Sequence, residues 1–183
     1  MKIVFMRARV LALVVGAVCI ALIVVFALRT VGGTRATTTP LGGSMAKAIS
    51  GTNLVNGATI SLSALRGRYV IVDFFASWCG ACLSEEPQIE AFTFAYRNDR
   101  TVGFIGVDID DSINNARGFF SRYGATWPAV VDTTGSIAQS YGVAQPPELF
   151  LVDPKGKIVS SISQQVTETE LSNWIREAKV ARA

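Results

Sequence analysis

Two cysteines three positions apart are the residues of this sequence best suited to chemistry. Cys79 and Cys82 form a Cys-x-x-Cys pair that follows an apolar run and opens a helical pattern. At the start of a helix, unpaired backbone N–H groups and the helix dipole stabilise an anion, which favours the attacking thiolate of Cys79. Cys82, one turn into the helix and more buried, can then attack a mixed disulfide formed at Cys79 and release the product. We expect the sulfur of Cys79 to lie within reach of another protein's sulfur.

Other uses of a cysteine pair compete with redox chemistry. A structural zinc site needs four ligands, and the chain has no histidine and three cysteines, so we predict no metal. A purely structural disulfide stays open, although a ring this small constrains the unfolded chain little. Cys19 lies within an apolar stretch, where a small residue of a membrane helix is a better interpretation than a lipid-modified cysteine. The pair itself is therefore predicted to be the redox-active disulfide, with no separate cofactor.

Two acidic residues lie where they could move protons for the cysteines. Asp73 interrupts the apolar run 69–75, and a buried carboxylate is costly unless it is neutral or paired. A protonated or water-linked Asp73 could relay the proton of Cys82, whereas the alternative is a strand-end Asp bonded to backbone. Glu85 lies one turn after Cys82 on the same helix face, as a second titrating group or as an ordinary solvated acid.

A proline pair and a tryptophan are candidates for the substrate groove. Pro146 and Pro147 directly precede the expected strand 149–152, and proline has no N–H to donate to a sheet. We predict that Pro147 is cis and packs beside the cysteines, leaving backbone groups free for an extended substrate strand. A plain turn is the alternative. Trp78 is expected to shield the sulfurs.

The elements that must position these residues alternate between strand and helix. The sequence predicts strands at 58–62, 69–75, 102–107, 128–131, 149–152 and 158–162, and helices at 63–67, 80–97, 112–123, 137–141 and 167–180. The strand–helix–strand half requires parallel pairing, and the hairpin around residues 153–156 adds antiparallel strands. We therefore expect an α/β domain with a mixed sheet and helices on both faces.

The composition points to one domain behind a membrane segment. Half of the 183 residues are hydrophobic and 17% are charged, and the apolar excess is concentrated at residues 10–28, which carry no charge. As a helix they span about 28 Å, close to the roughly 30 Å of a bilayer core. Residues 46–183 hold 12 basic and 14 acidic residues and no basic stripe, so nucleic acid is not an expected partner.

The charges around this segment predict its orientation. Residues 1–9 contain three basic side chains and residues 29–35 contain two. The positive-inside rule then favours a cytoplasmic segment 1–9, a transmembrane anchor 10–28 and an extracytoplasmic carboxyl-terminal domain. A cleaved signal peptide is the alternative. Residues 29–45 are rich in glycine and threonine and are expected to form a flexible linker to a domain at 46–183.

The sequence around the cysteines also resembles a known family. Asp73-Phe-Phe-Ala-Ser-Trp-Cys-Gly-Ala-Cys82, followed by Glu85-Glu-Pro87, resembles the thioredoxin-like superfamily, and more narrowly its membrane-anchored TlpA/ResA/DsbE branch. Tyr141-Gly-Val143, Pro147 and Phe150-Leu-Val-Asp153 match the same branch, over about residues 50–180. The resemblance implies a thioredoxin fold and dithiol–disulfide exchange, with Cys79 nucleophilic and Cys82 resolving. It further implies protein thiol or disulfide substrates such as apocytochrome c, and a membrane thiol carrier as electron donor.

Three departures from the branch leave the redox direction open. Ala81 stands where most members have proline, Asp73 where asparagine is common, and Pro146 replaces a small residue or threonine and alters the groove. We expect a dithiol reductant in cytochrome c maturation. The alternatives are a disulfide-forming oxidase of exported proteins and a redox-inactive binding or metal-holding module.

Overall fold

The computed structural model describes residues 14–22, 24 and 39–181. Residues 39–181 belong to one compact unit, and residues 14–22 are helical and belong to another. Among the described helices, none is both long enough and apolar enough to cross a bilayer. The predicted segments 1–9 and 10–28 lie wholly and partly outside the described residues, respectively.

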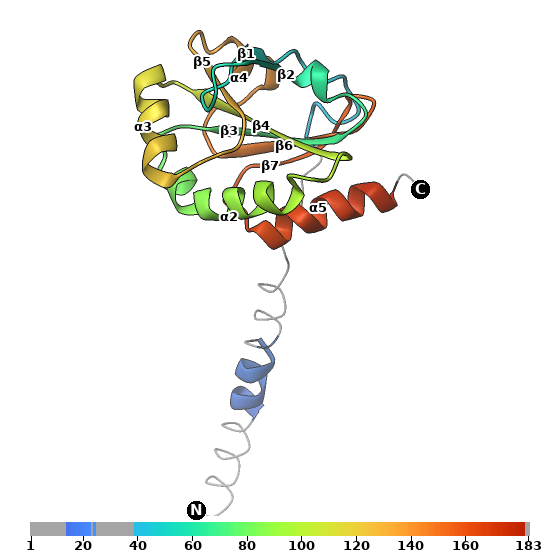
Figure 1. Ribbon diagram of the computed structural model, residues 1–183. Coiled ribbons are helices and arrows are strands. Elements are labelled where there is room, and N and C mark those ends of the chain that lie inside the picture. Colours follow the sequence, from blue (N-terminus) through green and yellow to red (C-terminus); the bar gives the residue numbers. More distant parts are fainter. Residues whose placement is uncertain (1–13, 23, 25–38, 182–183) are drawn as a thin grey trace, which may run out of the picture. The chain divides into compact units, whose positions relative to one another are not determined.

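The domain is built around a mixed five-stranded sheet (Figure 1). In chain order the elements are β1 (Ser50–Thr52), β2 (Thr59–Ser61), the short 3-10 helix η1 (Leu62–Leu65), β3 (Tyr69–Phe75), α2 (Gly80–Tyr96), β4 (Val102–Ile109), α3 (Ile113–Tyr123), β5 (Ala129–Asp132), α4 (Ser136–Tyr141), β6 (Glu148–Val152), β7 (Ile158–Ile162) and α5 (Glu168–Val180). The strand order is β5-β4-β3-β6-β7, with β3, β4 and β5 parallel and the other two antiparallel. The predicted mixed α/β sheet is confirmed.

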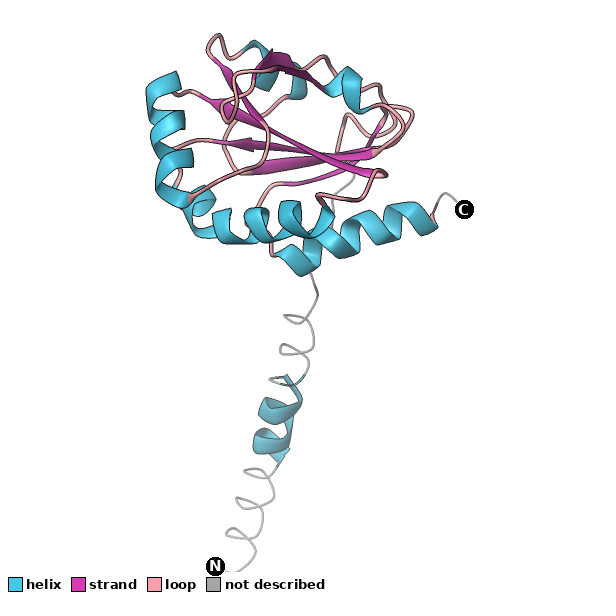
Figure 2. Ribbon diagram, viewed as in Figure 1, coloured by secondary structure: helices cyan, strands magenta, loops and turns pink. Residues whose placement is uncertain are grey.

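The centre of the sheet is β3, because its apolar run suits a strand covered on both faces. All seven residues of β3 are buried. Side chains alternate along a strand, so Ile71, Asp73 and Phe75 share one face. That face is covered by α2 and α5, which run side by side beneath the sheet (Figure 2). The opposite face packs on η1 and α4 through a second buried cluster.

Local signals end the helices where the sequence predicts. Ser112 caps α3 by accepting the N–H of Asn115, and Gly124 ends α3 in the left-handed conformation. Thr167 and Glu170 form a capping box at the start of α5. β1 and β2 form a separate two-stranded sheet. The strand predicted at 58–62 corresponds to β2, whereas β1 was not predicted.

The last residues of the predicted linker are bound to the domain by backbone hydrogen bonds. The backbone N–H of Gly43 donates to the carbonyl of Ile158, and Met45 forms a bridge with Lys157. Residues 39–45 therefore lie along the β6–β7 hairpin. Composition alone gives no sign of this, because backbone pairing depends on an edge that the rest of the fold provides. Residues 29–38 lie outside the described residues.

Candidate active site

The cysteine pair begins α2, as the spacing predicts. Cys79 is the N-cap residue and is joined to Cys82 by a disulfide. The Sγ atom of Cys79 also accepts the backbone N–H of Cys82 at 3.1 Å. The sulfur thus occupies the place of a capping oxygen, where an unpaired helix N–H can stabilise a thiolate once the bond is reduced.

Both cysteines are more enclosed than the sequence analysis expects. Cys79 is 5% exposed and Cys82 is 2% exposed. Cys82 is therefore the more buried of the two, as predicted, but Cys79 is not as accessible to another protein's sulfur as expected. The physical reason is packing: both cysteines belong to a buried cluster with Phe75 and Ala76, at the end of β3. A partner sulfur has only the narrow exposed part of Cys79 to approach while the disulfide is closed.

The loop before the cysteines is fixed by the end of β4. The backbone N–H of Ser77 donates to Oδ2 of Asp111 at 2.9 Å. Trp78 is 56% exposed, and its indole N–H donates to the carbonyl of Asp110 at 3.0 Å. Asp110 has a φ of 50°, a left-handed conformation that aspartate tolerates better than most residues. Burial opposes charge on Asp111, yet hydrogen bonds from Ser77, Ser112 and Asn115 hold the pKa of Asp111 below its usual value.

Asp73 lies on the α2 face of the sheet and is almost fully buried, at 2% exposure. Its Oδ1 atom has no hydrogen-bond partner within the described part of the chain. Burial, reinforced by the negative charges of Glu85 and Glu86, raises the pKa of Asp73 well above its ordinary value. A neutral Asp73 beneath the start of α2 is what a proton relay requires.

Glu85 is not the solvated helix acid that the sequence left as an alternative. It is 3% exposed, and its Oε2 atom accepts the backbone N–H of Val166 at 3.1 Å. Burial raises the pKa of Glu85 to about 7, the Val166 hydrogen bond opposes this, and Glu86 adds to it. Beside it, the amide of Gln165 donates to the carbonyl of Ala81. Glu85 therefore connects the segment before α5 to the helix that carries the cysteines.

Glu86 is a site residue that sequence reasoning missed. It is 3% exposed, and its Oε1 atom accepts the indole N–H of Trp127 at 3.1 Å. Burial raises the pKa of Glu86 to about 7, with Trp127 lowering it and Glu90 raising it. No sequence signal indicates this pair, because its two members are distant in the chain and an acid on a helix is ordinarily exposed.

Asp108 was also missed, although a signal was present. It is 0% exposed, and neither of its carboxyl oxygens has a hydrogen-bond partner among the described residues. Burial, and to a smaller degree Asp111, raises the pKa of Asp108 to about 8. It interrupts the apolar strand β4 just as Asp73 interrupts β3, and it lies opposite Phe75 in the parallel register. An acidic residue within an apolar run is therefore the sequence signal that both Asp73 and Asp108 carry.

The proline pair lies at the same end of the sheet as the cysteines. The Pro146–Pro147 bond is cis, which confirms the predicted isomer, and both prolines are half-buried. They precede β6, whose first residue Glu148 pairs with Phe74 near the end of β3. Since the cysteine loop follows β3 directly, the cysteine loop and the proline pair lie at the same end of the sheet.

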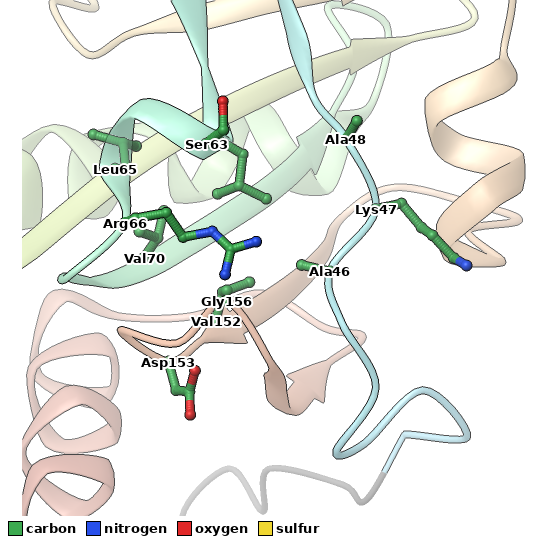
Figure 3. Close-up of a pocket in the computed structure, with 11 residues that line it drawn as sticks. Ala46, Lys47, Ala48, Ser63, Leu65, Arg66, Val70, Val152, Asp153 and Gly156 are labelled. Carbon is green, nitrogen blue, oxygen red and sulfur yellow. The ribbon is translucent and has the colours of Figure 1, made fainter.

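A cavity of about 160 Å³ lies at a different place (Figure 3). It is lined by Val70 at the start of β3 and by Val152 at the end of β6, with Arg66 pointing into it. Because the cysteines follow the opposite end of β3, this cavity is not part of the redox site. In the described part of the chain, no group of three or more acidic or cysteine side chains is placed to hold a metal ion.

Comparisons with known proteins agree on one kind of chemistry. The Redoxin family model matches residues 41–175. The thiol-disulfide oxidoreductase ResA of Bacillus subtilis is 30% identical over 124 residues, which cover 68% of this chain and 69% of ResA. The thioredoxin domain of a thiol-disulfide oxidoreductase from Bacteroides vulgatus is 28% identical with a TM-score of 0.66, covering 76% of this chain and 99% of that domain. StoA from Bacillus subtilis is 25% identical with a TM-score of 0.64, covering 72% and 98%.

Proposed function

The chain belongs to the Redoxin family, as a thioredoxin-like dithiol–disulfide oxidoreductase of the TlpA/ResA/DsbE type, and on this premise we propose that it is an extracytoplasmic reductant of protein disulfides in cytochrome c maturation. The observation that carries the proposal is the Cys79 sulfur at the N-cap of α2, where it accepts a helix N–H. Such a position lowers the free energy of the thiolate and equips Cys79 to attack.

The reaction begins from the reduced pair. The thiolate of Cys79 attacks one sulfur of a substrate disulfide, a mixed disulfide forms, and the other substrate sulfur leaves and takes up a proton. Cys82 then loses its proton and attacks the Cys79 sulfur, which releases the second substrate thiol. Two electrons pass from the pair to the substrate; Cys82 supplies one of the two protons that the product thiols need, and solvent supplies the other. A membrane dithiol carrier restores the reduced pair by the same exchange in the opposite sense.

Buried acids supply a place for the protons in this scheme. Asp73 holds a proton under the start of α2, and Glu85 titrates near neutral pH beside it. Asp73 is the proposed relay: it passes its proton to the departing substrate thiolate, and the carboxylate that results accepts the proton of Cys82, while the charge of Glu85 tunes the exchange. Trp78, Pro146 and Pro147 form the proposed rim for the substrate strand, with Trp78 exposed and the prolines at the same sheet edge.

The site of action is part of the proposal. The uncharged residues 10–28 and the basic side chains before them support a single-pass anchor with the domain outside the cytoplasm. Recovery of the full-length protein in the membrane fraction after alkaline extraction would support the anchor. Release of a shorter chain into the medium or periplasm would establish a cleaved signal peptide instead.

The proposed activity is tested with full-length protein in detergent and an oxidised Cys-x-x-Cys-His peptide, the kind of sequence to which haem is attached. We expect reduction of the peptide by the wild-type protein and none by Cys79→Ser. A potential near −270 mV is that of a reductant, whereas one near −120 mV would identify an oxidase and overturn the assignment. Trapping of mixed disulfides by Cys82→Ser in cells identifies the substrates.

A further inference from the structure

A polar and aromatic hollow is lined by residues that flank the redox pair in the chain. It measures about 280 Å³ and lies between the start of α2 and the helix α3. Ser77 and Leu83, which flank the Cys79–Cys82 segment in the chain, line one side, and α3 supplies the other. In Figure 1, α3 stands next to the amino-terminal end of α2. A chain held in this hollow would contact the residues that flank the two cysteines.

The first observation that points to a ligand in the hollow concerns Gly118. It lies inside α3 and lines the hollow, and an added Cβ there would have no atom within 4 Å. Glycine in a helix costs about 0.5–1 kcal/mol relative to alanine. Neither packing nor a left-handed backbone requires glycine here, in contrast to Gly106, where a Cβ would clash with the ring of Trp127. The bare backbone of α3 is therefore free for close approach by a ligand.

Arg122 is the second observation. It lines the hollow one turn after Gly118 and is exposed. Within the described residues it has neither an ion-pair nor a hydrogen-bond partner. Asp111, in the loop that Ser77 contacts, already accepts hydrogen bonds from Ser77 and Ser112. The cation of Arg122 is thus available to an anionic group that enters from outside.

The rim of the hollow suits a polypeptide. Tyr123 lines it and is 38% exposed, and Trp78, next to Ser77, is 56% exposed. Exposed aromatic side chains and arginine are enriched where proteins bind other proteins. Phe119 adds an apolar wall.

We propose that this hollow is a specificity subsite, which takes the chain flanking the reactive cysteine of a partner protein and places an acidic side chain of that partner against Arg122. The partner's backbone passes over Gly118, and its apolar side chains contact Phe119 and Tyr123. The inference rests on the proposed function, since it concerns which protein disulfides reach Cys79.

Two oxidised peptides test the subsite, identical except for aspartate or lysine at the positions flanking the disulfide. The measured quantity is the ratio of kcat/KM for the acidic peptide over the basic peptide, with full-length protein in detergent. Arg122→Glu is expected to lower this ratio at least about fivefold, since it replaces an attraction by a repulsion. Arg117→Glu, on the same helix but not lining the hollow, is the matched control and should leave the ratio within about twofold.

Gly118→Leu tests the approach of the backbone and should lower kcat/KM for both peptides roughly tenfold. Reduction of bis(2-hydroxyethyl) disulfide, which has no flanking chain, measures the redox centre in each variant. Gly118→Ala, which favours the helix, separates filling of the hollow from loss of fold. An unchanged ratio in Arg122→Glu, or an equal change in Arg117→Glu, would overturn the subsite.

A binding measurement keeps this result distinct from failure of the proposed function. Fluorescently labelled versions of both peptides with serine in place of cysteine are titrated with the oxidised protein. Tighter binding of the acidic peptide that is lost in Arg122→Glu supports the subsite, even for a protein that reduces no disulfide. Equal binding of both peptides contradicts it, even for an active reductase.

Discussion

Glu86 on α2 accepts a hydrogen bond from the indole N–H of Trp127 at 3.1 Å, and both side chains are buried. Trp127 packs edge-on against Phe75 and Phe104, so the bond connects the redox helix with the aromatic core. Burying a carboxyl group without a hydrogen-bond partner costs free energy. The hydrogen bond from Trp127 therefore allows Glu86 to be buried in the core.

Trp127→Phe should therefore destabilise the protein by about 1–3 kcal/mol, because it leaves Glu86 buried without its donor. Adding Glu86→Leu should recover much of the loss, as both partners are then apolar. Chemical denaturation followed by circular dichroism measures both. Trp174→Phe is the control, because Trp174 donates to the neutral hydroxyl of Ser160, and a loss as large as that of Trp127→Phe would argue against the special role of the carboxyl.

Asp108→Asn should change how stability depends on pH. The pKa of Asp108 is raised from 3.8 to about 8, so the folded state prefers the protonated form. The stabilising effect of that preference is complete below pH 3.8 and is lost as pH rises towards 8. The fall in unfolding free energy between pH 5 and pH 8 should be smaller in Asp108→Asn, by an amount on the order of a few kcal/mol. Asp110→Asn, at an exposed residue directly after the same strand, is the control and should keep the wild-type dependence.

Asp73→Asn should slow the reduction of a peptide disulfide at neutral pH, by roughly tenfold or more, because the amide cannot accept the Cys82 proton. The rate should recover as pH rises and Cys82 loses its proton to solvent. A pH profile of kcat/KM is the measurement, with Asp132→Asn as a control for a buried acid that accepts a backbone N–H of α4. An unchanged profile removes Asp73 from the mechanism, and uniform slowing at every pH makes its role structural.

Glu85→Gln should remove a limb of the same profile near pH 7, since the pKa of Glu85 is raised from 4.5 to about 7. It should also flatten the loss of stability between pH 4.5 and pH 7, where the raised pKa makes ionisation unfavourable to the fold. Glutamine can still accept the Val166 N–H, so the segment before α5 stays attached. Persistence of the limb in Glu85→Gln would assign it to another group, with Glu86→Gln as the next variant to examine.

The fold could be predicted from the sequence where local pattern and packing agree. The run 69–75 predicts β3 with its bounds, and the predicted helices 112–123 and 167–180 begin at the cap residues of α3 and α5. The site could be predicted where one residue carries its own signal, as the cysteines, Asp73 and the cis Pro147 do. The enclosure of Cys79, the Glu86–Trp127 bond and the docking of residues 39–45 depend on contacts between distant segments, for which one sequence holds no pattern.

The reactivity of the Cys79 thiol shows whether the helix start activates this sulfur. In reduced full-length protein, the rate of alkylation by iodoacetamide is followed against pH, and peptide mapping by mass spectrometry assigns the labelled cysteine. We expect Cys79 to be labelled before Cys82, with the midpoint of its labelling clearly below the value of about 8.5 for a free cysteine. A midpoint at or above that value, or labelling of Cys82 first, would contradict the role of Cys79 as the activated nucleophile.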